Sequence, residues 1–250
     1  VDPDARVEVI QEEEELEEQQ NRRRRRQLLL HDGKVMTRDV LVVRVTAQSS
    51  EIAHSRERLS EVVFGPVGTP RSQYEACSMG KLLLEPAKGR HIHQGVIELH
   101  VPVSHQGKNA LHYLEDMDEH LQPLLEKELD QYDHIMYCVP EGALSAHNSE
   151  RWNAFATVGH NRLVMNEPNC LYLSTHIHEL GHNLGLVHSG RDGVKYKDKS
   201  GVMGYGYSLI GAPLMCFNGA KNWQMGWYHD KAVELDSTLE RCGAWKGRLY

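Results

Sequence analysis

Residues 176–190 read HIHELGHNLGLVHSG, and this stretch determines most of what can be expected of the chain. Five of its residues fit the pattern H-E-x-x-H-x-x-G-x-x-H, namely His178, Glu179, His182, Gly185 and His188. On a helix, His178 and His182 project from one face about one turn apart, so both can hold one ion. Gly185 is expected to end this helix in a left-handed conformation, which turns the chain back and brings His188 to the same ion.

These three histidines predict a catalytic zinc site, with one Zn2+ ion, rather than a structural one. Three neutral nitrogen ligands leave the fourth tetrahedral position open for water, whereas structural zinc sites use four protein ligands. Glu179 lies ~100° around the helix from His178, so it is expected to act as general base and not as a ligand. The alternative is a helix with incidental histidines, which five matches at fixed spacing disfavour.

A second motif follows at residues 200–205, which read SGVMGY. An extended zinc motif followed by a turn that contains Met is the metzincin signature. By this resemblance Met203 forms a floor beneath the zinc ligands without binding the ion, although an ordinary core methionine would be buried in the same way. His176 precedes His178 by two residues and faces the opposite side of the helix, where packing or exposure is expected instead of metal binding.

Tyr205, two residues after Met203, resembles a Tyr of astacin-like and serralysin-like metzincins. In those enzymes it reaches the zinc at rest and hydrogen-bonds the oxyanion during catalysis. A phenol suits both tasks, because it ligates weakly through oxygen and donates a neutral hydrogen bond. Tyr207 lies nearby, but its spacing does not match. The alternative is a Tyr205 that packs under the site with its hydroxyl bonded elsewhere.

Three further strings narrow the resemblance: CSMGKL at 77–82, MYCVPEG at 136–142 and MCFNGAKNWQMGWY at 215–228. They resemble the gametolysin family, the cell-wall-lytic metallopeptidases of green algae, with relatives in other algae and protists. The resemblance covers roughly residues 40–228. It implies a secreted zinc endopeptidase, made as a precursor, that hydrolyses peptide bonds of extracellular or cell-wall proteins and glycoproteins.

Two other functions stay open at this point. A binding or adhesion module could keep the metal and lack catalysis, but the intact Glu179 argues against it. A zinc hydrolase could also act on an amide or ester other than a peptide, because activation of water is common to all such enzymes.

Hydrophobic patterning upstream of the motif predicts an α/β fold (α+β) of the metzincin type. Four apolar runs are typical of strands: Val40–Val45, Leu82–Leu84, Val96–Val103 and Ile135–Val139. Helical character runs from Glu51 to Val63 and is stopped by Gly65 and Pro66. The order β-α-β-β-α-β predicts a twisted, mostly parallel sheet, followed by the active-site helix and a C-terminal subdomain that contains the Met-turn.

Three further elements are expected. Leucine and methionine recur at spacings of three and four from Leu111 to Leu125, which predicts one apolar face of a long helix kinked at Pro123. Ala154–Gly159 is expected to be an exposed edge strand to which a peptide substrate adds, with a surface loop as the alternative. Three aromatic residues are expected in a C-terminal helix packed on the core: Trp223, Trp227 and Tyr228.

The start of the chain differs in composition from the rest. Residues 11–18 read QEEEELEE, and Arg22–Arg26 are five consecutive arginines. Because like charges repel and rarely pack, residues 1–33 are expected to be a disordered or pro-region segment ahead of a metzincin catalytic domain over residues 34–250. A solvated charged tail is the alternative to a pro-region.

Composition also limits partners and compartment. The net charge of -7 argues against nucleic acid as a partner, and no apolar run approaches the ~20 residues that span a bilayer. Five cysteines without a C-x-x-C pair favour an oxidising compartment, with two disulfides and one free thiol; five reduced cysteines in a cytosolic protein are the alternative. The sequence decides no pairing. Cys77 is not expected to be an inhibitory thiol, because it lies within the expected catalytic fold.

Overall fold

The computed structural model describes residues 35–47, 52–102, 110–141, 143, 153–204, 211 and 213–231. Its strands are β1 Met36–Ala47, β2 Leu82–Pro86, β3 Val96–Val101, β4 His134–Val139, β5 Ala154–Ala156 and β6 Arg162–Asn166. Its α-helices are α2 Arg56–Phe64, α3 Pro70–Cys77, α4 Ala110–Leu121, α5 Leu173–Asn183 and α6 Gly219–Met225. The predictions for residues 1–33, Tyr205 and Tyr207 fall outside the described residues, and so does the fifth cysteine, Cys242.

The six strands form one sheet in the order β2-β1-β4-β6-β5, with β3 also paired to β1. The long strand β1 pairs with β2 through its first half and with β3 through its second half, both in parallel. The β1–β4 and β4–β6 pairs are parallel as well, and only β5 runs antiparallel to its neighbour β6. The predicted mixed α/β fold with a mostly parallel sheet is therefore confirmed, and Ala154–Ala156 is the strand at its edge.

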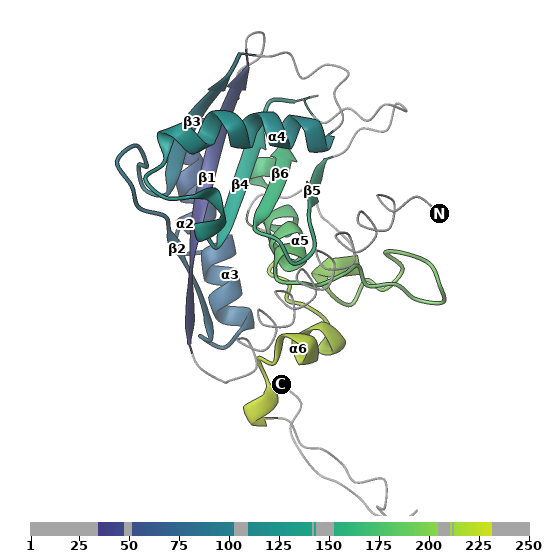
Figure 1. Cartoon of the computed structure of the whole chain (residues 1–250). Helices are drawn as coiled ribbons and strands as arrows, with labels where there is room; N and C mark the ends of the chain where they lie inside the picture. The colour runs from purple at the N-terminus through teal and green to yellow at the C-terminus, as the bar shows by residue number, and fades with distance from the viewer. Residues whose placement is uncertain are drawn as a thin grey trace, which may run out of the picture.

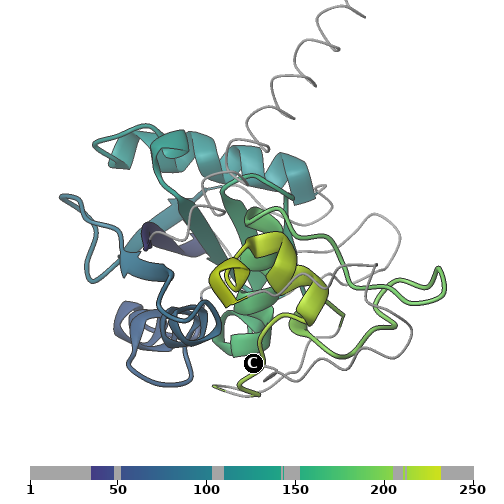
Figure 2. The ribbon, with the colours of Figure 1, turned by 90° about the horizontal axis from the view of Figure 1, so that it is seen from below.

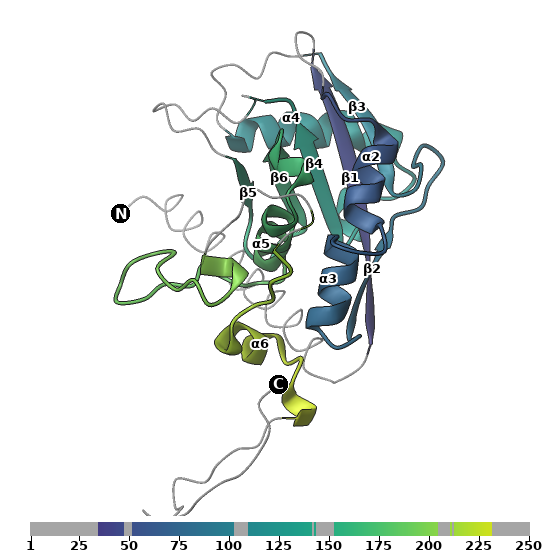
Figure 3. The same cartoon turned by 180° about the vertical axis from the view of Figure 1, so that it is seen from behind.

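Helices cover both faces of the sheet, α4 on one and α2, α3 and α5 on the other (Figures 1 and 3). Viewed from below, the sheet lies between α4 and the α2–α3 pair (Figure 2). Successive residues of β1 point to opposite faces, so Val40 and Val42 pack in the core under α2, α3 and α5, whereas Leu41 and Val43 pack in the core under α4. A strand covered on both faces is mostly apolar, which explains why five of the six residues in the run VLVVRV are apolar.

Two helices differ from the sequence prediction at their ends. α2 begins at Arg56 and not at Glu51, because the Ser55 side chain accepts a hydrogen bond from Arg58 N (3.3 Å) and caps the first turn. α4 ends at Leu121, and Pro123 lies in a short 3₁₀-helix that follows, so the proline ends the helix instead of kinking it.

Helix α3 and strand β6 were not predicted. Thr69 and Ser72 form a capping box at the start of α3, with Pro70 in its first turn. The pattern T-P-x-S was therefore a readable helix start that precedes too few apolar residues for periodicity to reveal it. β6 has only five residues, which is short for a pattern-based assignment.

The C-terminal aromatic residues follow the prediction in part. Trp227 is buried, and the Tyr228 hydroxyl donates a 2.8 Å hydrogen bond to the Cys77 carbonyl oxygen. Trp223 lies on α6 but is 58% exposed, so its predicted packing on the core is wrong. Gly226 ends α6 in the left-handed conformation (φ 69°), which takes Trp227 off the helix and into the core.

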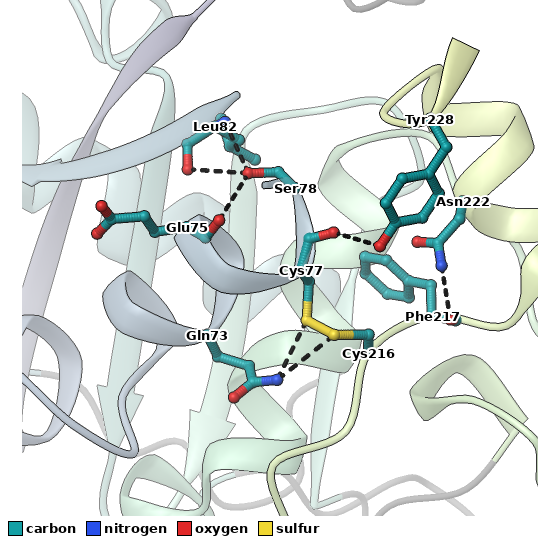
Figure 4. Close-up of a disulfide and its surroundings, with 9 residues drawn as sticks. All are labelled: Gln73, Glu75, Cys77, Ser78, Leu82, Cys216, Phe217, Asn222 and Tyr228. Carbon is teal, nitrogen blue, oxygen red and sulfur yellow. Dashed lines mark hydrogen bonds between the residues drawn. A yellow bond between two sulfur atoms is a disulfide. The ribbon is translucent and has the colours of Figure 1, made fainter. Parts of the chain in front are cut away.

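Two disulfides link segments that are distant in sequence, as the cysteine count predicted. Cys77 at the end of α3 is bonded to Cys216, and Cys138 on β4 is bonded to Cys170 (Figure 4 shows the first). The Gln73 side-chain amide donates to the Cys77 sulfur (3.1 Å). Because Cys77 is oxidised and buried, it is not a free thiol that blocks the site, in agreement with the sequence analysis.

Candidate metal centre

Helix α5 carries two of the three motif histidines, and its C-terminus delivers the third. The helix stops at Asn183, and Gly185 takes the left-handed conformation (φ 93°), as its place in the motif predicts. Gly185 N donates to His182 O (2.8 Å) and Leu186 N donates to Gly181 O (2.9 Å). This pair of bonds is a Schellman motif, which satisfies the last helical carbonyls and reverses the chain. The reversal brings His188 back against His182.

The three imidazoles meet at one point. One ring nitrogen from each of His178, His182 and His188 lies within 4.8 Å of the other two. The shortest separation, 3.0 Å, is between Nε2 of His182 and Nε2 of His188. Among the described residues this is the one group of histidine, cysteine or acidic side chains with a geometry that could hold a metal ion.

Backbone carbonyls orient two of these rings. His178 Nδ1 donates to Val202 O (2.9 Å), and His182 Nδ1 donates to Leu186 O (2.7 Å). A carbonyl oxygen can only accept, so Nδ1 carries the proton in both rings and Nε2 keeps a free lone pair. This arrangement is the usual support of a metal-binding histidine, because it fixes both the tautomer and the direction of the ring.

The histidines are also held in the uncharged form that binds metal. Burial lowers the pKa of His178 and of His188 to about 4, and the neighbouring His182 adds to the effect on both. Burial also lowers the pKa of His182. At neutral pH the three rings therefore need not lose protons before they ligate an ion.

Glu179 stands beside the histidines without a partner. Its side chain is 7% exposed, and its Oε2 is buried with no hydrogen-bond partner among the described residues. Burial raises the pKa of this carboxyl to about 8. A buried carboxylate oxygen without a partner is costly, so the site fits a group that is absent from the protein chain: a cation with a water molecule beside Glu179.

Met203 lies beneath α5 and is fully buried. It belongs to a 3₁₀-helix, Val202–Gly204, whose Val202 carbonyl accepts the His178 bond. The Met203 carbonyl accepts a hydrogen bond from Ser189 N (2.9 Å), one residue after the third histidine. A Cβ at Gly204 would lie 1.5 Å from Asp198 O, so the turn after Met203 has room only for glycine.

His176 is a packing residue and not a ligand. Its ring is 1% exposed, and its Nε2 donates to the Cys170 carbonyl (2.7 Å) on the side of α5 away from the other histidines. This agrees with the prediction made from its position on the helix. Burial lowers the pKa of His176 to about 4, so it is neutral at physiological pH.

A hollow of about 550 Å³ opens beside His182 and His188. One wall is Val158, just after the edge strand β5, and the other is formed by residues 190–195. Within that second wall Arg191 and Val194 exchange two backbone hydrogen bonds (3.1 and 3.0 Å) around the turn residues Asp192 and Gly193. This small hairpin was not predicted from the sequence, although Asp192-Gly193 is the characteristic dipeptide of such turns.

Tyr196 follows this hairpin and was also missed. Its ring centroid lies 4.1 Å from that of His188 and 6.3 Å from that of His178. Tyr196 has positive φ (62°), which is uncommon for a residue with a bulky side chain. No short-range pattern in the sequence signals this contact, because it depends on how the hairpin folds back over the site.

An α/β fold that presents three imidazole nitrogens and a lone carboxylate beside an open hollow has the architecture of a metal-dependent hydrolase. The class of hydrolase follows from a comparison with protein families. Residues 50–240 match the family model of the gametolysin peptidases, M11. The chain belongs to the gametolysin peptidase family M11, and it is therefore a metallopeptidase. No match was found among curated proteins.

Proposed function

We propose that the chain is a zinc-dependent endopeptidase of the metzincin type that cleaves proteins or glycoproteins outside the cell. One observation carries the proposal: ring nitrogens of three histidines converge, and Glu179, next to His178 in the chain, has a buried Oε2 with no partner among the described residues. His178, His182 and His188 are the proposed ligands. Imidazole nitrogen suits zinc well, and three such ligands leave one coordination position open, as catalytic zinc sites require.

When bound, zinc supplies a Lewis acid that activates water and polarises the scissile carbonyl. Glu179 is the proposed general base: its carboxylate takes the proton of the attacking water and passes it to the leaving amine. The burial that raises the pKa of Glu179 to about 8 makes it a stronger base than an exposed glutamate. With a cation held by the three histidines, the pKa of Glu179 would be lower, and its carboxylate would be available as a base at neutral pH.

The substrate is proposed to bind as an extra strand along β5. This strand lies at the edge of the sheet, antiparallel to β6, so one side of its backbone is free of sheet partners among the described strands. Val158, just beyond β5, lines the hollow beside His182 and His188. A peptide paired with β5 would thus run past the ligands and place one side chain in this hollow.

Met203 is proposed to be the Met-turn floor of the metzincin type, on the strength of its burial under α5. The role of Tyr205 in oxyanion binding stays a prediction from sequence. An extracellular site of action is supported by the two disulfides, which persist in oxidising compartments. None of the described helices is both long and apolar enough to cross a membrane.

The experiment that tests the proposal uses casein or gelatin as substrate. Protein purified without chelators is incubated with the substrate, then with added chelator, and then with zinc restored. We expect fragments in the first and third reactions and none in the second, with one zinc per chain by elemental analysis. Bound zinc without turnover on any protein substrate would favour a metal-binding module, and absence of metal together with no activation by zinc would overturn the proposal.

A further inference from the structure

Tyr196 packs against the histidines and is partly exposed to solvent. Its ring is 46% exposed, is stacked at 24° to the ring of His178 and lies closest to His188, at 4.1 Å. Met203, in contrast, is fully buried beneath the helix that carries the ligands. The ring of Tyr196 is therefore a partly exposed cover on the histidine cluster.

The backbone at Tyr196 is strained to achieve this placement. A φ of 62° lies in the left-handed region, which costs a residue with a side chain on the order of 1 kcal/mol. Because the ring is half-exposed, its burial offsets only part of that cost. The preceding hairpin at Asp192 and Gly193, also with positive φ, aims the segment back across the site. Residues with strained backbones cluster at active sites and ligand-binding sites, so the strain at Tyr196 indicates a functional role.

The ring of Tyr196 lies against two of the three histidines, so its hydroxyl is held near the site. The hydroxyl has no hydrogen-bond partner among the described residues, whereas those of Tyr74 and Tyr228 donate to the carbonyls of Ile177 and Cys77. It is therefore free to donate to a bound ligand.

We propose that Tyr196 is a catalytic residue of this peptidase, whose hydroxyl donates a hydrogen bond to the scissile carbonyl oxygen of the bound peptide as negative charge develops there. The ring, packed on His188, holds the hydroxyl in place and keeps water from the open side of the ligands. The inference rests on the proposed function and adds a residue to it. Tyr196 and Tyr205 are therefore alternative donors of the hydrogen bond to the scissile carbonyl oxygen.

The first test is Tyr196→Phe in the full chain loaded with zinc, since Phe keeps the ring and removes only the donor. We expect kcat for a peptide substrate to fall ~10²-fold, as for loss of one oxyanion donor, with KM within about 2-fold of the wild type and one zinc per chain. Tyr228→Phe is the matched control, because its hydroxyl bonds to Cys77 O instead. It should keep the wild-type kcat.

A binding measurement separates catalysis from structure. A phosphinic peptide mimics the charged tetrahedral state, and an uncleaved peptide bound to the Glu179→Gln variant mimics the ground state. In a Tyr196→Phe background, the first should bind ~10²-fold more weakly and the second with unchanged affinity. Equal losses for both ligands would make Tyr196 a substrate-binding residue only and would overturn the proposal.

A stability measurement completes the test. Tyr196→Gly removes the backbone strain, so its melting temperature should equal or exceed that of the wild type, while kcat falls at least as far as in the Phe variant. A clearly lower melting temperature with full kcat in Tyr196→Phe would make Tyr196 a structural residue. If Tyr205→Phe loses kcat and Tyr196→Phe does not, the assignment is wrong, although chelator-sensitive cleavage by the wild type still upholds the proposed function.

Discussion

Gly181 and Met203 approach so closely that no side chain fits between them. A Cβ at position 181 would lie 2.7 Å from the Met203 sulfur and 3.1 Å from Cε1 of Phe217. Gly181 directly precedes His182 on α5. The absence of one methyl group at position 181 therefore sets how closely α5 packs on Met203.

Gly181→Ala should weaken both fold and site. Alanine gains ~1 kcal/mol in helix propensity, but overpacking against Met203 typically costs ~1–3 kcal/mol and displaces the helix. We expect lower unfolding free energy and weaker zinc affinity, measured by urea unfolding and by competition with a chelator. Gly219→Ala is the control, since a Cβ there meets no atom within 4 Å. A Gly181→Ala protein with unchanged zinc affinity would show that Met203 is not a rigid floor.

Glu179→Gln should separate metal binding from turnover. Gln keeps size and polarity and cannot accept the proton, so turnover should drop by ~10² or more while zinc stays bound. Elemental analysis and cleavage of a fluorogenic peptide measure the two quantities on one sample. Near-normal turnover would remove Glu179 from the mechanism.

The buried His176 should make stability depend on pH. Its pKa is about 4 in the folded protein and about 6.5 when unfolded, so between these values the unfolded chain binds the extra proton. The unfolding free energy contributed by this group is thus complete above pH ~6.5 and is lost as the pH falls toward ~4. Between pH 7 and pH 5 the loss is about 2 kcal/mol.

His176→Gln tests this dependence, because its amide can still donate to Cys170 O and does not titrate. In metal-free protein, urea unfolding at pH 7 and pH 5 should show a drop in unfolding free energy that is about 2 kcal/mol smaller in the variant than in the wild type. Parallel pH dependences in the two proteins would assign the effect to other groups.

Pairing of the substrate with β5 predicts sensitivity to the peptide backbone. Methylation of one substrate N–H removes one hydrogen bond, worth ~0.5–1.5 kcal/mol, and should raise KM by a factor of ~2–10. Because successive N–H groups of a strand point in opposite directions, the effect should alternate along the peptide. A series of singly N-methylated substrates measures this, and a KM without alternation would argue for recognition by side chains alone.

The parts of the site formed by residues close together in the sequence could be predicted, and the parts formed by residues far apart in the sequence could not. His178, His182 and His188 follow from helical spacing and one left-handed glycine, which are properties of adjacent residues. The pairing of Cys77 with Cys216 spans 139 residues and depends on how α3 meets the C-terminal segment.

The contact of Tyr196 with His188 depends likewise on a hairpin that folds back over the site. Among the secondary structure elements, β1 was readable because burial on both faces makes its central residues, 40–43, apolar. α3 was missed because it is short and mostly polar, so its capping box is the main sequence signal that indicates a helix there.

The Cys77–Cys216 bond has a consequence for a peptidase surrounded by copies of itself. The exposed turn at Asp192 and Gly193 is the kind of place where another peptidase cuts first. Such a cut would leave the three histidines on one fragment and Met203 on the other, yet the fragments would carry Cys77 and Cys216 respectively and stay joined. A nicked molecule would therefore remain one covalent particle until a reductant separates the fragment with the three histidines from the fragment with Met203.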